Sequence, residues 1–261
     1  MLKLGAILPH PPILVPEIGG GEVKKIKATA LAMEKVAEDF ETAKIETVII
    51  ISPHAPMVSE AFTVLKSERY TGDFSQFGFG GNLIELEGNS KLEEKIQEKA
   101  RENNLPLLTL NMSQLDHGIL VPLYFLSKKN DFKLVPLAYS LLSRDEHIKF
   151  GEVLKEVAQK TRENIAIVAS GDLSHCLTED APAPYNPRGK EFDEKMKELL
   201  EEQKFEEIIN LDENLVEEAA ECGYRSILIL LGAIKDLNLK AEVLSYEGPF
   251  GVGYLVAEFK K

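Results

Sequence analysis

Tryptophan is absent from this chain of 261 residues, and cysteine and histidine are scarce, with two and five copies. Nothing in the sequence marks secretion, so the two cysteines, Cys176 and Cys222, do not indicate a disulfide-held secreted domain. We therefore expect both thiols to be reduced and the protein to be cytoplasmic.

Basic residues are fewer than acidic ones, and long apolar runs are absent. The 43 acidic residues outnumber the 30 basic ones, which leaves a net charge of −13 at pH 7. A protein of this sign repels phosphate groups, so we expect neither nucleic acid nor an anionic membrane as a main partner. The longest apolar run near the C-terminus, SILILLGAI at 226–234, has nine residues and is too short to cross a bilayer. The N-terminal MLKLGAILPHPP has too short an apolar core and no small-residue cleavage site, so we do not expect it to be a signal peptide.

The pattern that is present is that of an α/β domain. Residues 2–8 and 45–52 are apolar and rich in β-formers, whereas residues 22–42 space their apolar side chains as a helix does. Further strands are predicted at 106–110, 132–140, 164–170, 241–247 and 251–259, and helices at 90–104, from 118, and at 144–161, 187–208 and 213–235. Residues 60–89 predict short strands and an exposed loop at the sheet edge. We predict a single domain, 1–261, with a mixed central β-sheet flanked by helices on both faces.

Four of the five histidines lie where chemistry is expected. His10, His54 and His175 each follow an apolar strand, and His117 opens a helix. Ligands bind at the carboxyl edge of the strands in open α/β sheets, and convergent imidazoles suit Zn, Fe, Cu or Ni. The spacing matches neither a zinc finger nor an HExxH helix, and GFGGN at 78–82 is too loose for a phosphate-binding loop. The fifth, His147, is predicted to be structural or to lie on a solvated helix.

Four short motifs in register resemble the class III extradiol ring-cleavage dioxygenases. They are LPHPPILV (8–15), ISPHAP (51–56), LDHG (115–118) and ASGDLSHC (169–176). The closing segments ECGYRSILILLGAI and GPFGVGYLVAEF look more like the Memo branch of this superfamily. The resemblance covers essentially the whole chain.

The resemblance implies an Fe(II) site and names its ligands. His10 and His54 match the family's two metal-binding histidines, and Glu221, in EEAAECGYRS, is the best match to its glutamate. The neighbouring Cys222 stands where the Memo branch carries a metal-site cysteine, and a thiolate would favour Zn or Cu. His175 matches the catalytic base, and His117 matches a position that helps to hold substrate or dioxygen.

Two functions follow as alternatives from the resemblance. The first is an extradiol dioxygenase that opens a catechol-type or aminophenol-type ring beside the diol, with a small aromatic substrate, dioxygen and a homo-oligomer or partner subunit. The second is a Memo-like metal- or ligand-binding protein without ring cleavage. The two histidine ligands and the base favour the first, and the context of Cys222 favours the second. Asp116 and Asp172 would orient imidazoles or cap helices.

Overall fold

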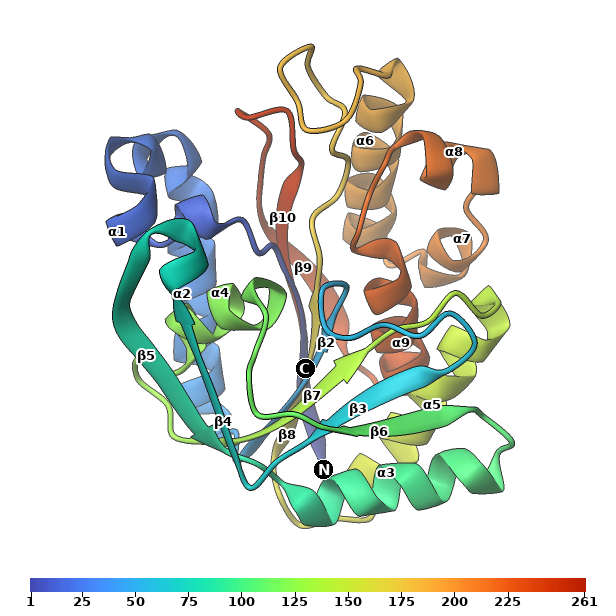
Figure 1. Cartoon of the computed structure of the whole chain (residues 1–261). Coiled ribbons are helices and arrows are strands. Elements are labelled where there is room, and N and C mark those ends of the chain that lie inside the picture. Colours follow the sequence, from blue (N-terminus) through green and yellow to red (C-terminus); the bar gives the residue numbers. More distant parts are fainter.

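An eight-stranded mixed sheet forms the centre of the molecule, in the order β6-β3-β7-β2-β8-β1-β10-β9 (Figure 1). The computed structural model describes the backbone of residues 1–261 and all side chains except that of Asn82. The strands of this sheet are β1 (Leu2–Leu8), β2 (Thr47–Ser52), β3 (Phe62–Lys66), β6 (Leu107–Asn111), β7 (Lys133–Ala138), β8 (Ile165–Ser170), β9 (Lys240–Glu247) and β10 (Tyr254–Lys260). The central strands β7, β2, β8 and β1 are mutually parallel, whereas β3 and β10 run antiparallel to their neighbours β7 and β1.

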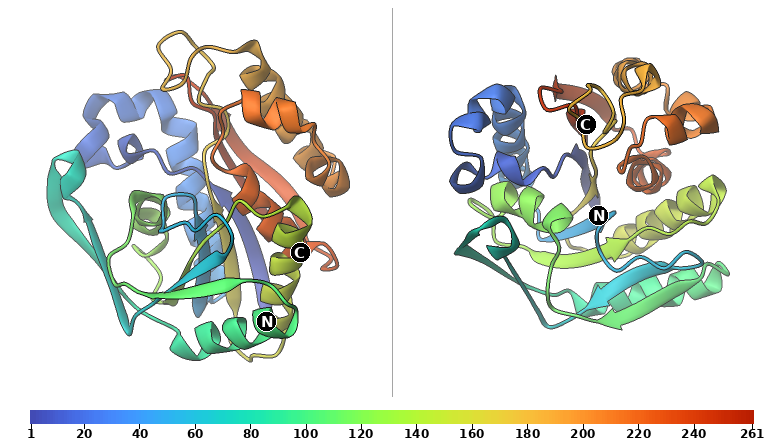
Figure 2. Two further views of the ribbon diagram at one scale, coloured as in Figure 1. Left: turned by 45° about the vertical axis from the view of Figure 1, so that its right-hand side comes forward. Right: turned by 45° about the horizontal axis from the view of Figure 1, so that its top comes forward.

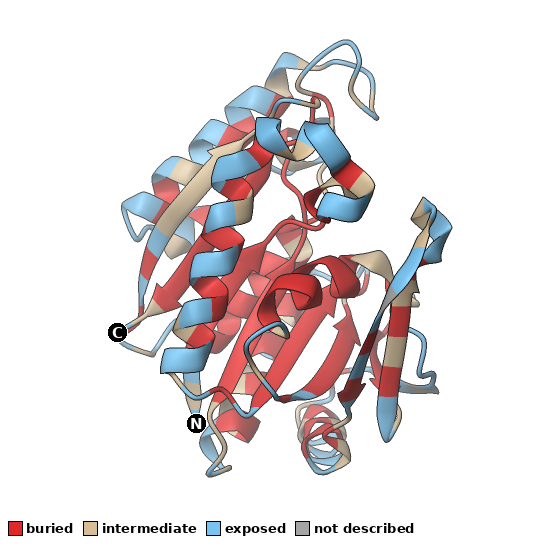
Figure 3. Ribbon diagram, turned by 90° about the vertical axis from the view of Figure 1, so that its left-hand side faces the viewer, coloured by how far each residue is buried: buried red, intermediate tan, exposed pale blue. Residues whose placement is uncertain are grey.

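Helices cover both faces of the sheet, as predicted (Figure 2). Alternation along β2 explains this, because Val48 and Ile50 face one layer of core while Ile49 and Ile51 face the other. The first face carries α2 (Lys27–Thr42) and α4 (His117–Leu126), and the second carries α3 (Ser90–Glu102), α5 (Arg144–Gln159), α6 (Pro187–Glu201) and α9 (Tyr224–Ile234). The short helices are η1 (Pro12–Leu14), α1 (Pro16–Gly19), η2 (Gly20–Ile26), α7 (Phe205–Ile209) and α8 (Glu213–Glu218). In Figure 3 the central strands are buried, whereas the edge strands β6 and β9 are partly exposed, and most of the helices expose their outer sides.

A separate hairpin accounts for most of the excursion predicted at 60–89. It consists of β4 (Arg69–Phe74) and β5 (Phe79–Glu87), joined by the single turn η3 (Ser75–Phe77). Gly72 lets the hairpin approach α4, because a Cβ there would lie 2.6 Å from Leu120. The preceding segment differs from the prediction, since β3 belongs to the main sheet between β6 and β7.

The two long C-terminal helices predicted at 187–208 and 213–235 are each interrupted. The second interruption, at residues 219–223, contains Ala220 with φ of 52° and separates α8 from α9. It is held from outside the helix: the N–H groups of Cys222 and Gly223 donate to the carbonyl of Asp172, at 3.3 and 3.0 Å. A Cβ on Gly171 would lie 2.1 Å from the Gly223 Cα, so the two backbones touch. A contact between residues 50 positions apart therefore ends the helix.

The prediction of a solvated position for His147 is wrong, although its structural role is right. The side chain is fully buried, with its ring nitrogens 2.8 and 3.1 Å from the carbonyl oxygens of Ser143 and Ser140. Its ring also packs edge-on against Phe62 of β3. His147 thus fastens the start of α5 to the loop that follows β7.

Candidate metal centre

The parallel strands β1, β2 and β8 bring their histidines to one edge of the sheet. His10, His54 and His175 follow the carboxyl ends of these strands, and His117 is the first residue of α4. The rings of His10 and His54 meet edge to face with centroids 4.9 Å apart, and His117 stacks on His54 at 4.2 Å. The prediction that these histidines share one edge of the sheet is confirmed.

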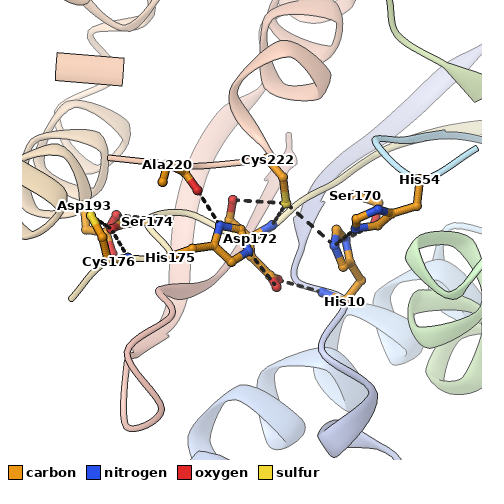
Figure 4. A network of polar contacts seen from close by, with 10 residues as sticks. All are labelled: His10, His54, Ser170, Asp172, Ser174, His175, Cys176, Asp193, Ala220 and Cys222. Atoms are coloured by element: carbon orange, nitrogen blue, oxygen red, sulfur yellow. Dashed lines mark hydrogen bonds and ion pairs between the residues drawn. The ribbon is translucent and has the colours of Figure 1, made fainter. Parts of the chain in front are cut away.

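Three possible metal ligands converge here, from His10, His54 and Cys222 (Figure 4). The two Nε2 atoms lie 3.1 Å apart, the Cys222 Sγ lies 3.7 Å from Nε2 of His10, and all three atoms fall within 4.8 Å of one another. Two imidazole nitrogens that share one ion, each at about 2.0–2.1 Å, are themselves separated by roughly 3 Å. His10 is buried, Cys222 is half-buried and His54 is exposed, so the group is reached from one side.

The tautomer of His10 is fixed by a buried serine at the end of β8. Ser170 Oγ lies 3.0 Å from Nδ1 of His10 and donates its own hydrogen to the carbonyl of Gly118. Because that hydrogen is committed, the serine oxygen accepts from Nδ1–H of His10. The Nε2 lone pair is then free and faces the other two donors, as a metal ligand requires.

Asp172 contacts both Cys222 and the loop that carries His10. Its backbone N–H points at Cys222 Sγ at 3.3 Å, and its carboxylate accepts from the backbone N–H of His10 at 2.9 Å. Burial and the adjacent Asp172 raise the pKa of the Cys222 thiol well above its ordinary value, so the thiol is protonated when no cation is near. A bound cation would favour the thiolate, which the N–H of Asp172 also stabilises.

The expectation that Glu221 is the third donor is not met by the geometry. Its carboxylate accepts from the backbone N–H of Tyr224 and caps the start of α9, and it is not in the cluster. Burial raises the pKa of Glu221 to about 7. Because residues 219–223 form a turn, the neighbouring side chains part: Cys222 faces the imidazoles and Glu221 lines a pocket beside Tyr224 and Arg225.

His175 and His117 stand beside the three donors without joining them. Nδ1–H of His175 donates to the carbonyl of Ala220 at 2.7 Å, which leaves its Nε2 unprotonated, 3.9 Å from Asp172 Oδ2. Burial lowers the pKa of all four clustered histidines, and neighbouring histidines lower that of His10 and His54 further. The four rings are therefore neutral at pH 7, the form that binds metals and accepts protons.

Several supporting residues carried only a faint sequence signal. Neither Ser52 nor Ser170 has a role that the sequence alone predicts. The hydroxyl of Ser52 donates to Asp116 at 2.7 Å and accepts from the backbone N–H of His54 at 3.1 Å. Both serines occupy the last position of a fully buried strand, directly before the loop that carries a site residue, and that placement was the available signal. Asp116 begins α4 but makes no side-chain cap, so it acts through Ser52.

Comparison with known families gives a match over nearly the whole chain. Residues 4–257 match the family described as "Catalytic LigB subunit of aromatic ring-opening dioxygenase". Among solved structures, an uncharacterized protein of Escherichia coli K12, JW3007, superimposes with a TM-score of 0.69 at 17% identity, covering 98% of this chain and 99% of that one. The latter likeness concerns the fold alone.

Curated relatives come from both branches suggested by the motifs. Protein CA_C1420 of Clostridium acetobutylicum is 39% identical over 97% of this chain and 56% of its own length, so this chain spans about half of that relative. The 3,4-dihydroxyphenylacetate 2,3-dioxygenase of Escherichia coli is 23% identical, over 80% of this chain and 81% of its own. The MEMO1 family protein MMP1387 of Methanococcus maripaludis is 24% identical, over 77% of each chain. No helix among the described residues is long and apolar enough to span a membrane.

Proposed function

The chain belongs to the family of catalytic LigB subunits of aromatic ring-opening dioxygenases, and from this premise we propose that His10, His54 and Cys222 hold one transition-metal ion that serves oxidative chemistry on a small hydroxylated aromatic compound. The observation that carries the proposal is the convergence of their three donor atoms within 4.8 Å. Glu221, bonded to the start of α9, is left out of the ligand set.

The donor set fits a transition metal and restricts its kind. Two neutral imidazoles and a thiol are borderline to soft ligands, which Ca²⁺ and Mg²⁺ avoid and which Fe(II), Zn and Cu accept. Fe(II) is the ion implied by the resemblance, and the sulfur makes Zn and Cu the alternatives. Two hydrogen bonds around the site favour the ligand forms: the Ser170 hydroxyl oxygen accepts from Nδ1–H of His10 and so frees its Nε2 lone pair, and the backbone N–H of Asp172 points at the sulfur of Cys222.

The metal, when bound, would supply a Lewis-acidic and, if iron or copper, redox-active centre for substrate and dioxygen. The chain itself supplies the proton acceptor. His175 is neutral, its Nδ1–H is anchored on the Ala220 carbonyl, and its Nε2 is left to take a proton from a phenolic hydroxyl. His117 stacks on His54 beside the three donors and would contact the substrate or dioxygen.

A second candidate function is Memo-like metal or ligand binding without ring opening. The observation that favours it is the thiol of Cys222, because an Fe(II) site that binds both substrate and dioxygen is usually completed by a carboxylate. The relatives on this side of the family include the MEMO1 family protein of M. maripaludis.

Metal analysis and oxygen uptake test the proposal together. Protein purified without oxygen is loaded with Fe(II), Zn or Cu(I), and the bound metal is counted for wild type, Cys222→Ala and the matched neighbour Glu221→Gln. We expect one ion per chain in wild type and Glu221→Gln, and loss of most of it in Cys222→Ala. The reverse order between the two variants would overturn the ligand assignment.

The Fe(II) form is then offered catechols and 2-aminophenols while dissolved oxygen is recorded. Consumption of one O₂ per ring-opened product supports oxidative ring cleavage. Tight metal binding with no oxygen consumption on any of these substrates would refute the oxidative part and leave the Memo-like function.

A further inference from the structure

The turn η3, at the tip of the hairpin β4–β5, places an aromatic ring against a histidine of the metal centre. The ring of Phe77 meets that of His117 edge to face, with centroids 5.5 Å apart and planes inclined by 75°. His117 in turn stacks on His54, the exposed member of the three residues that converge as metal ligands. A series of touching aromatic rings therefore leads from His54 to the hairpin.

The hairpin lies against α4 and is fixed to the segment that leads into this helix (Figure 1). Thr71 of β4 donates its N–H to the carbonyl of Ser113, and its own carbonyl accepts from the N–H of Leu115, both at 2.9 Å. His117 follows two residues later and begins α4. One short stretch of chain thus holds both the hairpin and the imidazole, so the main-chain pairing of β4 sets where Phe77 lies relative to His117.

The three phenylalanines of the tip have different surroundings. Phe74 is fully buried and packs against Tyr124 of α4, which anchors the hairpin. The ring of Phe79 lies across its own strand, 3.0 Å from where a Cβ on Gly81 would stand. Among the described residues, only the ring of Phe77 of these three contacts a histidine, and it is half-buried. Part of this ring is therefore free to make a further contact.

The tip of the hairpin carries no charge. Residues 74–84 contain no Asp, Glu, Lys or Arg, although 28% of the chain is charged. Aromatic rings attract one another in edge-to-face and offset-stacked arrangements. An uncharged surface that ends in Phe77 and continues in the imidazole of His117 therefore favours a flat aromatic ring as its ligand.

We propose that Phe77 is a substrate-contact residue, whose ring packs against the aromatic ring of a compound bound at the metal centre through its oxygens. This role rests on the proposed function and adds the residue that recognises the ring of the substrate, as distinct from its oxygens. A ligand that contacts His117 comes within reach of Phe77, because the two side chains already touch. A chelator without a ring would bind the same ion and gain nothing from Phe77.

The test compares an aromatic and an aliphatic chelator on the full chain loaded with Zn, which does not oxidise either ligand. 4-Nitrocatechol is titrated by its change in absorbance, and acetohydroxamate, which binds metals through two oxygens and has no ring, is measured by its displacement of 4-nitrocatechol. Loss of the aromatic contact in Phe77→Ala should raise the dissociation constant for 4-nitrocatechol by at least about 3-fold and leave that for acetohydroxamate within about 2-fold. Phe77→Tyr keeps the ring and should bind both chelators like wild type. Phe79→Ala removes a ring from the same tip and is the matched control, with both affinities expected to be unchanged.

The outcomes separate this role from the proposed function. If Phe77→Ala binds 4-nitrocatechol like wild type, or loses affinity equally for both chelators, Phe77 does not contact the aromatic ring and the proposed function is unaffected. A loss in Phe79→Ala or in Phe77→Tyr as large as that in Phe77→Ala would likewise overturn the role of Phe77. Failure of the metal-loaded wild type to bind 4-nitrocatechol at all would refute the proposed function, and this inference with it.

Discussion

Replacing Ser170 by alanine should weaken metal binding although the serine is not a ligand. Ser170 accepts from Nδ1–H of His10, and His10 is only 2% exposed, so no water replaces the lost acceptor. The imidazole must then either keep a buried N–H without a partner or move its proton to Nε2, the atom that faces the other donors. Either change opposes the form that binds metal.

Two separate estimates give the same free-energy cost for the loss of this hydrogen bond. A buried N–H that loses its partner costs about 1–3 kcal/mol. Loss of a hydrogen bond behind a metal-binding histidine typically lowers affinity about 10- to 100-fold, which is about 1.4–2.7 kcal/mol. We therefore expect Ser170→Ala to raise the dissociation constant for Zn²⁺ by one to two orders of magnitude.

The assay is competition with a chelator of known affinity, at fixed pH, for wild type, Ser170→Ala and Ser174→Ala. Ser174 is an equally buried serine four residues away that contacts Cys176 and none of the three donors, so its loss should leave the affinity within about 3-fold. Thermal unfolding of the metal-free proteins checks that both variants are folded. An affinity of Ser170→Ala equal to that of Ser174→Ala would refute the tautomer argument.

Three further predictions concern other residues. His175→Ala should retain the metal while losing any ring-opening activity, whereas His54→Ala should lose the metal itself; equal metal loss in the two would contradict the separate roles. Burial raises the pKa of Asp193 to about 7, so the folded state keeps a proton that the unfolded state releases near 3.8, and the stability from this group falls between about pH 4 and 7, by up to about 4 kcal/mol. Denaturant unfolding of Asp193→Asn should show a shallower decline over that range, and an unchanged slope would argue against it. Gly171→Ala should destabilise the fold by more than 2 kcal/mol, because the new Cβ would meet Gly223 at 2.1 Å; an unchanged unfolding midpoint would contradict the contact.

Sequence patterns predicted the sheet and the position of the histidines, because both depend on short apolar runs and on the residues that directly follow them. Apolar runs of six or seven residues predicted β1, β2 and β8, and parallel strands necessarily bring the residues that follow them to one edge. The placement of His10 and His54 follows from that geometry alone. The two prolines after His10 lead into η1, which turns the chain away directly behind the ring.

The third donor could not be predicted, because it depends on a contact distant in sequence. The helical spacing of apolar side chains continues through 213–235. On one unbroken helix Glu221 and Cys222 would point in different directions, and the pattern does not show which of them faces the metal. The turn at 219–223 exists because the Asp172 carbonyl takes the N–H groups of Cys222 and Gly223. His147 illustrates the same limit, since the carbonyls that surround it belong partly to the loop before its helix.

The distance along the chain between the donors has a kinetic consequence. His10 and Cys222 are 212 residues apart: His10 follows β1, whereas Cys222 lies in the turn before α9, which is held by the loop that follows β8. Binding of the ion offsets the entropy lost on closing so long a loop only once β1, β2 and β8 are already paired. The metal therefore cannot nucleate folding as it does in a zinc finger. During synthesis the third donor emerges only after most of the sheet, which makes metal loading a late step on an already folded scaffold. The protein should accordingly refold at the same rate with the metal ion present as in a strong chelator.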